Sequence, residues 1–315
     1  MLSLQRLALP LTFAQLAFAA NTFVTSLFLS RSSTTALHAS LPGSMLAVAV
    51  SSLAISALGY SGTVFADRHG SGDTPGALAA FRSALAVAIR LRPLECRARQ
   101  MCRADFRTLI SLGVPNGVRA VIDIGGFFVF TAILAEREDA AVAASTAAFA
   151  VNGIYQALPQ GLSQALEIMT ARAARENRSA LLAPALRLVA IHALAFIAVL
   201  SVFGRELLDA FASKGDASFA DGFSATAKTL VLILCAKAVF ESAVQVLQAH
   251  LRGRGETAAV FRIQCATSLL FWIPLFLAVR TCAPGIPAYW LTMLASSALA
   301  CAVLYLRTSA IARPI

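Results

Sequence analysis

Apolar residues run along this chain in long stretches that short polar connections separate. Eight such stretches lie near residues 8–30, 44–66, 109–134, 142–165, 183–204, 226–250, 259–279 and 286–306. Each is close to the ~20 residues that a helix needs to cross a bilayer. Strands of a membrane barrel would alternate polar with apolar residues, and these stretches do not. The pattern therefore predicts an all-α, polytopic membrane helix bundle of about eight transmembrane helices.

The composition agrees with a protein that lies in lipid. Hydrophobic residues make up 58% of the 315 residues, charged residues make up 13%, and the mean hydropathy is +0.74. A soluble domain carries roughly 25% charged residues. The formal net charge is +10, but the basic residues are scattered between the apolar stretches. This distribution argues against nucleic acid as a partner and favours loop charges that set the orientation in the membrane.

The charge of the connections alternates along the chain. Residues 68–107 carry eight arginines, whereas the connection 136–139 is mostly acidic and 172–178 is basic again. Basic loops face the cytoplasm, so we predict a multi-pass protein of the inner (plasma) membrane with both termini in the cytoplasm. The segment 76–91 is short and holds Arg82 near its middle. It is therefore predicted to be an amphipathic helix in the membrane interface, in contact with lipid headgroups.

Two acidic residues, Asp123 and Glu241, interrupt apolar stretches far from the ends. Each follows a cation by four residues, Arg119 and Lys237 respectively, so each pair lies on one face of a helix. A charged side chain at the bilayer centre costs roughly 2.5–3.5 kcal/mol on insertion scales. The functional interpretation is a cation or proton site formed by Asp123 and Glu241 and tuned by their basic neighbours. The alternative is two closed ion pairs within helices whose charges merely cancel.

Uncharged polar side chains supply further candidates inside the stretches. They could line a cavity or join helices by hydrogen bonds, and they are Asn21, Thr25, Asn152, Gln156, Gln160 and Gln245. The sequence contains no nucleophile–base pair, phosphate-binding loop or cluster with metal-ligand spacing. We therefore predict no enzyme, no catalytic residues, no metal site and no cofactor other than a coupling ion, Na⁺ or H⁺.

Three motifs then stand out at the ends of the stretches. The first is Leu9-Pro10, followed by Ala39, Gly59-Tyr60 and Gly70. The second is Leu112-Gly113-Val114-Pro115-Asn116-Gly117, and the third is Leu251-Arg252-Gly253-Arg254-Gly255-Glu256-Thr257. Together they resemble the multidrug and toxic compound extrusion (MATE) family of efflux transporters, over most of the chain.

The resemblance implies roles for the two intramembrane acids. Asp123 lies eight residues after Pro115, where cation-coupled members of the family hold a carboxylate in the C-terminal lobe. Glu241 lies eleven residues before Arg252, where such members hold a second acid. The coupling aspartate of the N-terminal lobe would fall fifteen residues after Pro10, and Thr25 stands there instead.

Full-length relatives have two lobes of six spans, and this chain lacks four of them. The resemblance thus implies an incomplete two-lobe MATE-like fold. Residues 1–107 would form a truncated N-terminal lobe with two spans and a basic amphipathic cytoplasmic segment, and residues 108–315 a C-terminal lobe of six helices.

The first functional hypothesis is a secondary-active transporter that exports organic or drug-like solutes, cationic or amphipathic, by cation- or proton-coupled antiport. A second hypothesis is a shortened, non-transporting membrane protein, either a remnant or a scaffold. A third is a lipid-linked oligosaccharide flippase of the same superfamily, which predicts a large basic central cavity. The expected partners are a small organic substrate and membrane lipid, and the sequence does not fix an oligomeric state.

Overall fold

Long helices make up the part of the chain that the structure describes. The computed structural model describes residues 2–32, 43–44, 46–48, 65, 68–89, 117–118, 120–122, 124–126, 128–129, 139–173, 178–211, 217–282 and 285–312. The main elements are α1 (Leu2–Ser32), α4 (Thr74–Ile89), α6 (Asp139–Arg172), the 3-10 turn η2 (Ser179–Leu181), α7 (Leu182–Asp209), α8 (Ala217–Gly253), α9 (Thr257–Cys282) and α10 (Ile286–Ala312). No strand occurs among the described residues, and the prediction of an all-α bundle is confirmed.

Among the described residues, five helices are long and apolar enough to cross a membrane. They cover Leu4–Arg31, Ser179–Gly204, Gly222–Gly253, Thr257–Ala278 and Pro287–Ile311. Together with α6, they account for six of the eight predicted spans. The other two, 44–66 and 109–134, lie mainly outside the described residues. Helix α6 is long but less apolar, because glutamine and asparagine side chains recur along it.

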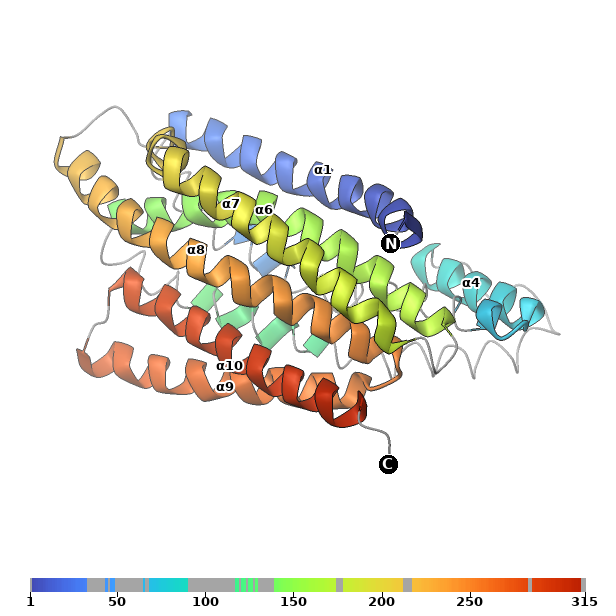
Figure 1. The fold of residues 1–315 in the computed structure, drawn as a ribbon. Helices are drawn as coiled ribbons and strands as arrows, with labels where there is room; N and C mark the ends of the chain where they lie inside the picture. Colours follow the sequence, from blue (N-terminus) through green and yellow to red (C-terminus); the bar gives the residue numbers. More distant parts are fainter. Residues whose placement is uncertain are drawn as a thin grey trace.

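Helix α8 lies at the centre of the bundle, where α6, α7 and α10 all pack against it (Figure 1). Helix α1 covers α6, and α9 packs beside α10. Helix α6 is therefore enclosed by α1, α7 and α8. This arrangement buries Asn152 and Gln156 of α6, whereas Gln160 and Gln164 of the same helix are exposed.

Helix α1 packs along the length of α6 in the opposite direction. Near one end, Leu4 and Leu166 belong to one hydrophobic cluster, and near the other end Phe23 packs against the cluster that holds Ala143 and Ala144 of α6. At the middle, a Cβ on Gly161 would lie 2.5 Å from the backbone nitrogen of Thr12. A side chain at this position would prevent the close contact, so glycine is needed here. Small residues commonly allow such close packing between membrane helices. The predicted division into lobes at residue 107 stays a prediction, and α1 contacts the second predicted lobe directly.

Residues 76–89 of the predicted segment 76–91 lie in the helix α4, and the location of this helix in the membrane interface stays a prediction. Asp73 precedes α4 and accepts a hydrogen bond from the Gly76 N–H at 2.9 Å, so it caps the helix. Gly72 has a φ of 83°, which allows the turn before the cap. The Arg68 guanidinium donates to the Gly76 carbonyl at 3.0 Å. In Figure 1, α4 lies beyond one end of the bundle, on the side where α1 begins.

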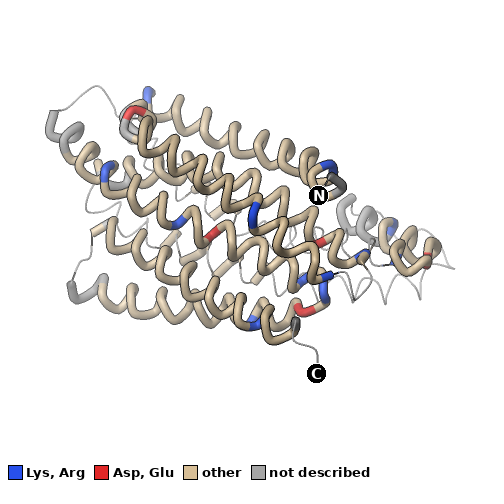
Figure 2. The backbone as a smooth tube through the Cα atoms, in the orientation of Figure 1, with Lys and Arg blue, Asp and Glu red and all other residues tan. Residues whose placement is uncertain are grey.

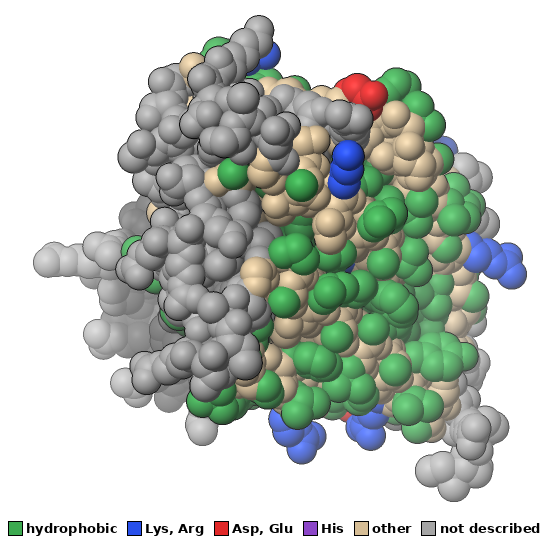
Figure 3. All heavy atoms as spheres, turned by 90° about the vertical axis from the view of Figure 1, so that its left-hand side faces the viewer, with side chains coloured by type: hydrophobic (Ala, Val, Ile, Leu, Met, Phe, Trp, Pro, Cys, Tyr) green, Lys and Arg blue, Asp and Glu red, His purple; other side chains and the backbone are tan. Residues whose placement is uncertain are grey.

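The described ends of the chain lie at the same end of the bundle (Figure 1). Basic side chains gather at that end, near the start of α1, the ends of α6, α8 and α10, and the start of α9 (Figure 2). On the face shown in Figure 3, hydrophobic side chains predominate among the described residues and charged ones are few. Among the described residues, basic side chains are thus more frequent at the end of the bundle that holds the described termini than at the opposite end (Figure 2).

Candidate functional site

A polar cavity of about 510 Å³ lies between α1, α6, α8, α9 and α10. The described residues that line it include six glutamines, which are Gln15, Gln160, Gln164, Gln245, Gln248 and Gln264. The lining hydroxyl side chains are Ser163, Ser268, Thr292, Ser296 and Ser297. The charged ones are Lys237, Glu241 and Arg252, and the apolar ones are Val244, Phe271, Trp272, Met293 and Ala300. Its size is within the range of small-molecule sites, roughly 300–1,000 Å³.

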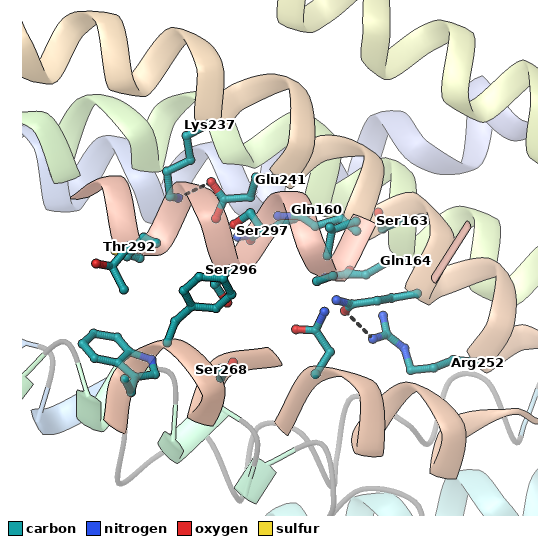
Figure 4. A pocket seen from close by; sticks show the side chains of 18 of the residues that line it. Gln160, Ser163, Gln164, Lys237, Glu241, Arg252, Ser268, Thr292, Ser296 and Ser297 are labelled. Atoms are coloured by element: carbon teal, nitrogen blue, oxygen red, sulfur yellow. Dashed lines mark hydrogen bonds and ion pairs between the residues drawn. The ribbon is translucent and has the colours of Figure 1, made fainter. Parts of the chain in front are cut away.

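Lys237 and Glu241 form an ion pair within α8, at the edge of the cavity. The Lys237 Nζ contacts Glu241 Oε2, and Figure 4 shows the two side chains turned toward each other. Lys237 is 2% exposed, whereas Glu241 is 25% exposed. The spacing of four residues predicts this pair, and the apolar stretch around it predicts its position near the middle of the Gly222–Gly253 span. The carboxylate thus has both a fixed cationic partner and access to the cavity.

Tyr155 fixes the backbone of α8 beside this pair. Its hydroxyl donates to the Ala238 carbonyl at 2.7 Å and also contacts the Ser242 hydroxyl. The ring stacks on His192 of α7, with centroids 4.9 Å apart, and the His192 Nε2 lies 3.1 Å from the Tyr155 carbonyl oxygen. One buried side chain therefore joins α6, α7 and α8 at the level of Glu241.

A second ion pair lies at the other end of the cavity. The Arg252 Nε donates to Glu167 Oε2 at 2.9 Å, and Arg252 Nη1 donates to Gln248 Oε1 at 3.3 Å. Glu167 is 11% exposed and Arg252 is 16% exposed. Figure 4 shows Arg252 at the opposite end of the row of glutamines from Lys237. The cavity is thus bounded by a charged pair at each end.

The turn after Arg252 explains the third sequence motif. A Cβ on Gly253 would lie 2.7 Å from the Glu167 carbonyl oxygen, so this position keeps α8 close to α6. Gly255 has a φ of 88°, which the turn into α9 requires. Glu256 then accepts a hydrogen bond from Arg307 of α10 at 2.8 Å. Gly253, Gly255 and Glu256 of the motif thus each have a local structural role.

The predicted uncharged residues are distributed unequally around the cavity. Gln160 and Gln245 line it, and Gln245 Nε2 donates to Gln156 Oε1. Gln156 and Asn152 are buried on α6 and are not among the lining residues. Asn21 and Thr25 are exposed on α1 and do not line the cavity either.

Arg119 and Asp123 lie outside the described residues. Of the residues near them that are described, Gly126 lies against the ring of Trp272, since a Cβ there would be 2.7 Å from it. Trp272 lines the cavity. Ile124 and Phe128 pack against the largest hydrophobic cluster.

Several residues of the site have no counterpart among the sequence predictions. Glu167 bonds the lining residue Arg252 without lining the cavity itself; it follows the predicted span 142–165, and its partner is 85 positions away. The hydroxyls of α9 and α10 and the remaining glutamines were also missed. A helical period links Gln156, Gln160 and Gln164 on one face of α6, and this signal could have extended the prediction.

The family model MatE matches residues 115–277, which is just over half of the chain. The chain belongs to the MatE family. The matched region contains both ion pairs, Lys237–Glu241 and Glu167–Arg252. No curated protein matches the chain.

MatE proteins are membrane efflux transporters and not enzymes, and the apolar helices make this member a multi-pass membrane protein. The family match ends within α9, so the part of the cavity that α10 contributes lies outside it. The match to the family model confirms the resemblance that the sequence motifs indicate.

Proposed function

We propose that this MatE protein exports organic or drug-like solutes by cation- or proton-coupled antiport, with Glu241 as a coupling carboxylate. The observation that carries the proposal is the partial exposure of Glu241 to a polar cavity at mid-span, while Lys237 is buried against it. A carboxylate in this position can bind H⁺ or Na⁺ from the cavity. Intramembrane acids in such places mark ion or proton pathways.

Lys237 would control the binding of the coupling ion to Glu241. When the ammonium neutralises Glu241, the site holds no net charge, and a proton or Na⁺ must compete with the built-in cation. Neutralisation of Glu241 by an ion from the cavity releases Lys237 from its partner, so the net charge of the pair changes from zero to positive. This change would bias the helices around α8 between two arrangements, as alternating access requires. Asp123, from its sequence position, is proposed as the second coupling acid and Arg119 as its tuning partner.

The proposed orientation places both termini in the cytoplasm of the plasma membrane. It is supported by the gathering of basic side chains at the end of the bundle where the chain begins and ends (Figure 2). The flippase alternative expects a strongly basic central cavity. Among the described lining residues there are two cations and one acid, which does not favour it.

The experiment is a proton- and Na⁺-flux assay in proteoliposomes that hold the purified full chain. An imposed solute gradient should drive the flux of one of the two ions in the wild type. Glu241→Gln should abolish this flux, whereas Glu256→Gln, which alters an exposed pair between α9 and α10, should retain it. Unchanged flux in Glu241→Gln would remove the coupling role. No solute-dependent flux from the wild type, with a correctly folded chain, would favour the non-transporting scaffold.

A further inference from the structure

We infer that the cavity takes a neutral, saccharide-type solute, rich in hydroxyl or acetamido groups, and not a lipophilic cation. This inference rests on the proposed export function and names the substrate class for the same cavity. Three features of the described lining carry it: the balance of its charges, the density of its hydrogen-bonding groups and the position of its aromatic rings.

Among the described lining residues, no acid lacks a cationic partner. Glu241 is the one acid among the described lining residues, and Lys237 already contacts it. Arg252 is the other lining cation, and it is bonded to the nearly buried Glu167. Of the described lining residues, only Glu241 could bind a lipophilic cation, which would compete there with Lys237 and stay beside this 2% exposed like charge. A neutral solute needs no exchange at Glu241, so it leaves that carboxylate to the coupling ion.

The lining is dense in groups that both donate and accept hydrogen bonds. Amide side chains from α1, α6, α8 and α9 face hydroxyl side chains from α6, α9 and α10 (Figure 4). Ser163 is 5% exposed, and its Oγ has no hydrogen-bond partner among the described residues. Gln245 donates to Gln156, but within the same part of the chain its own Oε1 has no partner. A buried polar atom left unsatisfied costs about 1–3 kcal/mol, so such a lining favours a solute with many hydroxyl or amide groups.

Aromatic rings provide one apolar side of the cavity. Phe271 and Trp272 of α9 line it, and Trp272 is held between Phe276, at 5.5 Å, and Tyr289, at 5.2 Å between ring centroids. Trp272 is buried between these rings, whereas Phe271 is half-buried, so the electronegative π face of Phe271 is the one that can attract the weakly positive C–H face of a pyranose. The hydroxyls at the edge of the same pyranose can then reach the amides and hydroxyls opposite. A cavity of about 510 Å³ suits a mono- or disaccharide.

The chain contains a reporter for this site. It has two tryptophans, Trp272 in the cavity and Trp290, which is fully buried and donates to Ser145 Oγ at 2.8 Å. Titration of the nanodisc-embedded chain with N-acetylglucosamine or its β-1,4-linked dimer should change the tryptophan emission saturably. Trp272→Phe should remove the change. Ser163→Ala should weaken the apparent affinity about 5- to 10-fold, the effect of one net hydrogen bond.

Matched controls make the result specific to the cavity. Ser201→Ala changes an exposed serine of α7 that bonds only its own helix, at Ile197, and should leave the titration unchanged. Tetraphenylphosphonium should give no saturable change. Saturable binding of tetraphenylphosphonium without binding of either saccharide would overturn the inference. So would the absence of saturable binding by all three probes in a chain that elutes as a folded monodisperse species.

The flux assay separates this inference from the proposed function. Saccharide binding without any ion flux would leave the substrate class standing and overturn the antiport. Ion flux driven by tetraphenylphosphonium and not by the saccharides would leave antiport standing and overturn the substrate class. Flux driven by N-acetylglucosamine, and lost in Glu241→Gln, is the result expected if both hold.

Discussion

The Nε of Arg252 lies 2.9 Å from Glu167 Oε2, and this bond joins α8 to α6 near the C-terminal ends of both helices. The two helices run in the same direction, so their partially negative C-terminal ends lie at the same side of the bundle (Figure 1). The positive Arg252 guanidinium offsets both the partial negative charge of the helix ends and the charge of the Glu167 carboxylate. Gly253 strengthens the contact, because its lack of a side chain lets α8 approach the Glu167 carbonyl.

Arg252→Ala should therefore destabilise the protein strongly. Breaking one side of a buried ion pair costs about 3–5 kcal/mol, and the 16% and 11% exposure of this pair puts the expected loss near the low end. Thermal unfolding of the detergent-solubilised chain measures it. Arg307→Ala is the matched control, because Arg307–Glu256 is an exposed arginine–glutamate pair worth about 0.2–1 kcal/mol. Equal losses in the two variants would contradict the role of burial.

Lys237→Met should lower stability, since it leaves Glu241 in the span without its cation. Glu241 is 25% exposed to the cavity, so the loss should fall below the ~3–5 kcal/mol of a fully buried pair. The double variant Lys237→Met with Glu241→Gln should recover most of that loss, because neither charge remains. Unfolding temperatures of the two single variants and the double variant give the coupling energy. Additive effects would show that the two side chains do not interact.

Gly161→Ala should separate α1 from α6. The added Cβ would lie 2.5 Å from the Thr12 backbone nitrogen, so one helix must shift, at an expected cost of about 1–3 kcal/mol. Gly153→Ala is the control in the same helix, since no atom lies within 4 Å of its added Cβ. It should be neutral or slightly stabilising, by up to ~1 kcal/mol of helix propensity. Protease sensitivity of α1, together with thermal unfolding, distinguishes the two.

Tyr155→Phe should cost about 0.5–1.5 kcal/mol, the net value of a hydrogen bond. The lost bond is the one to the Ala238 carbonyl, while Ser242 keeps its own bond to the same carbonyl at 2.6 Å. Since Tyr155 fixes the α8 backbone beside Glu241, ion flux should also fall, although the loss of stability is small. Tyr305→Phe, at a tyrosine that is exposed on α10, should leave both unchanged. A loss of stability with normal flux would make Tyr155 a packing residue only.

The helices and one ion pair of this protein could be predicted because their signals are local. Long apolar runs predict α7, α9 and α10 directly, and a spacing of four residues predicts Lys237–Glu241. Glu167–Arg252 could not be predicted in this way, because the pairing depends on how α6 and α8 pack. The same holds for the cavity, whose lining comes from five helices. Asn21 and Thr25 show that a polar residue within a span does not by itself predict a position in the cavity. The composition of the span does not give the helix face that the residue occupies, and both residues are exposed on α1.

Lys237 and Glu241 belong to one helix, one turn apart, whereas Glu167 and Arg252 belong to two. Any rigid displacement of α8 therefore carries the mid-span pair with it intact, and no charge is stranded in the hydrocarbon while the helix moves. Unlocking that pair needs only the rotation of side chains, which is fast and local. The pair between α6 and α8, in contrast, must break if those two helices slide apart, so it resists the motion itself.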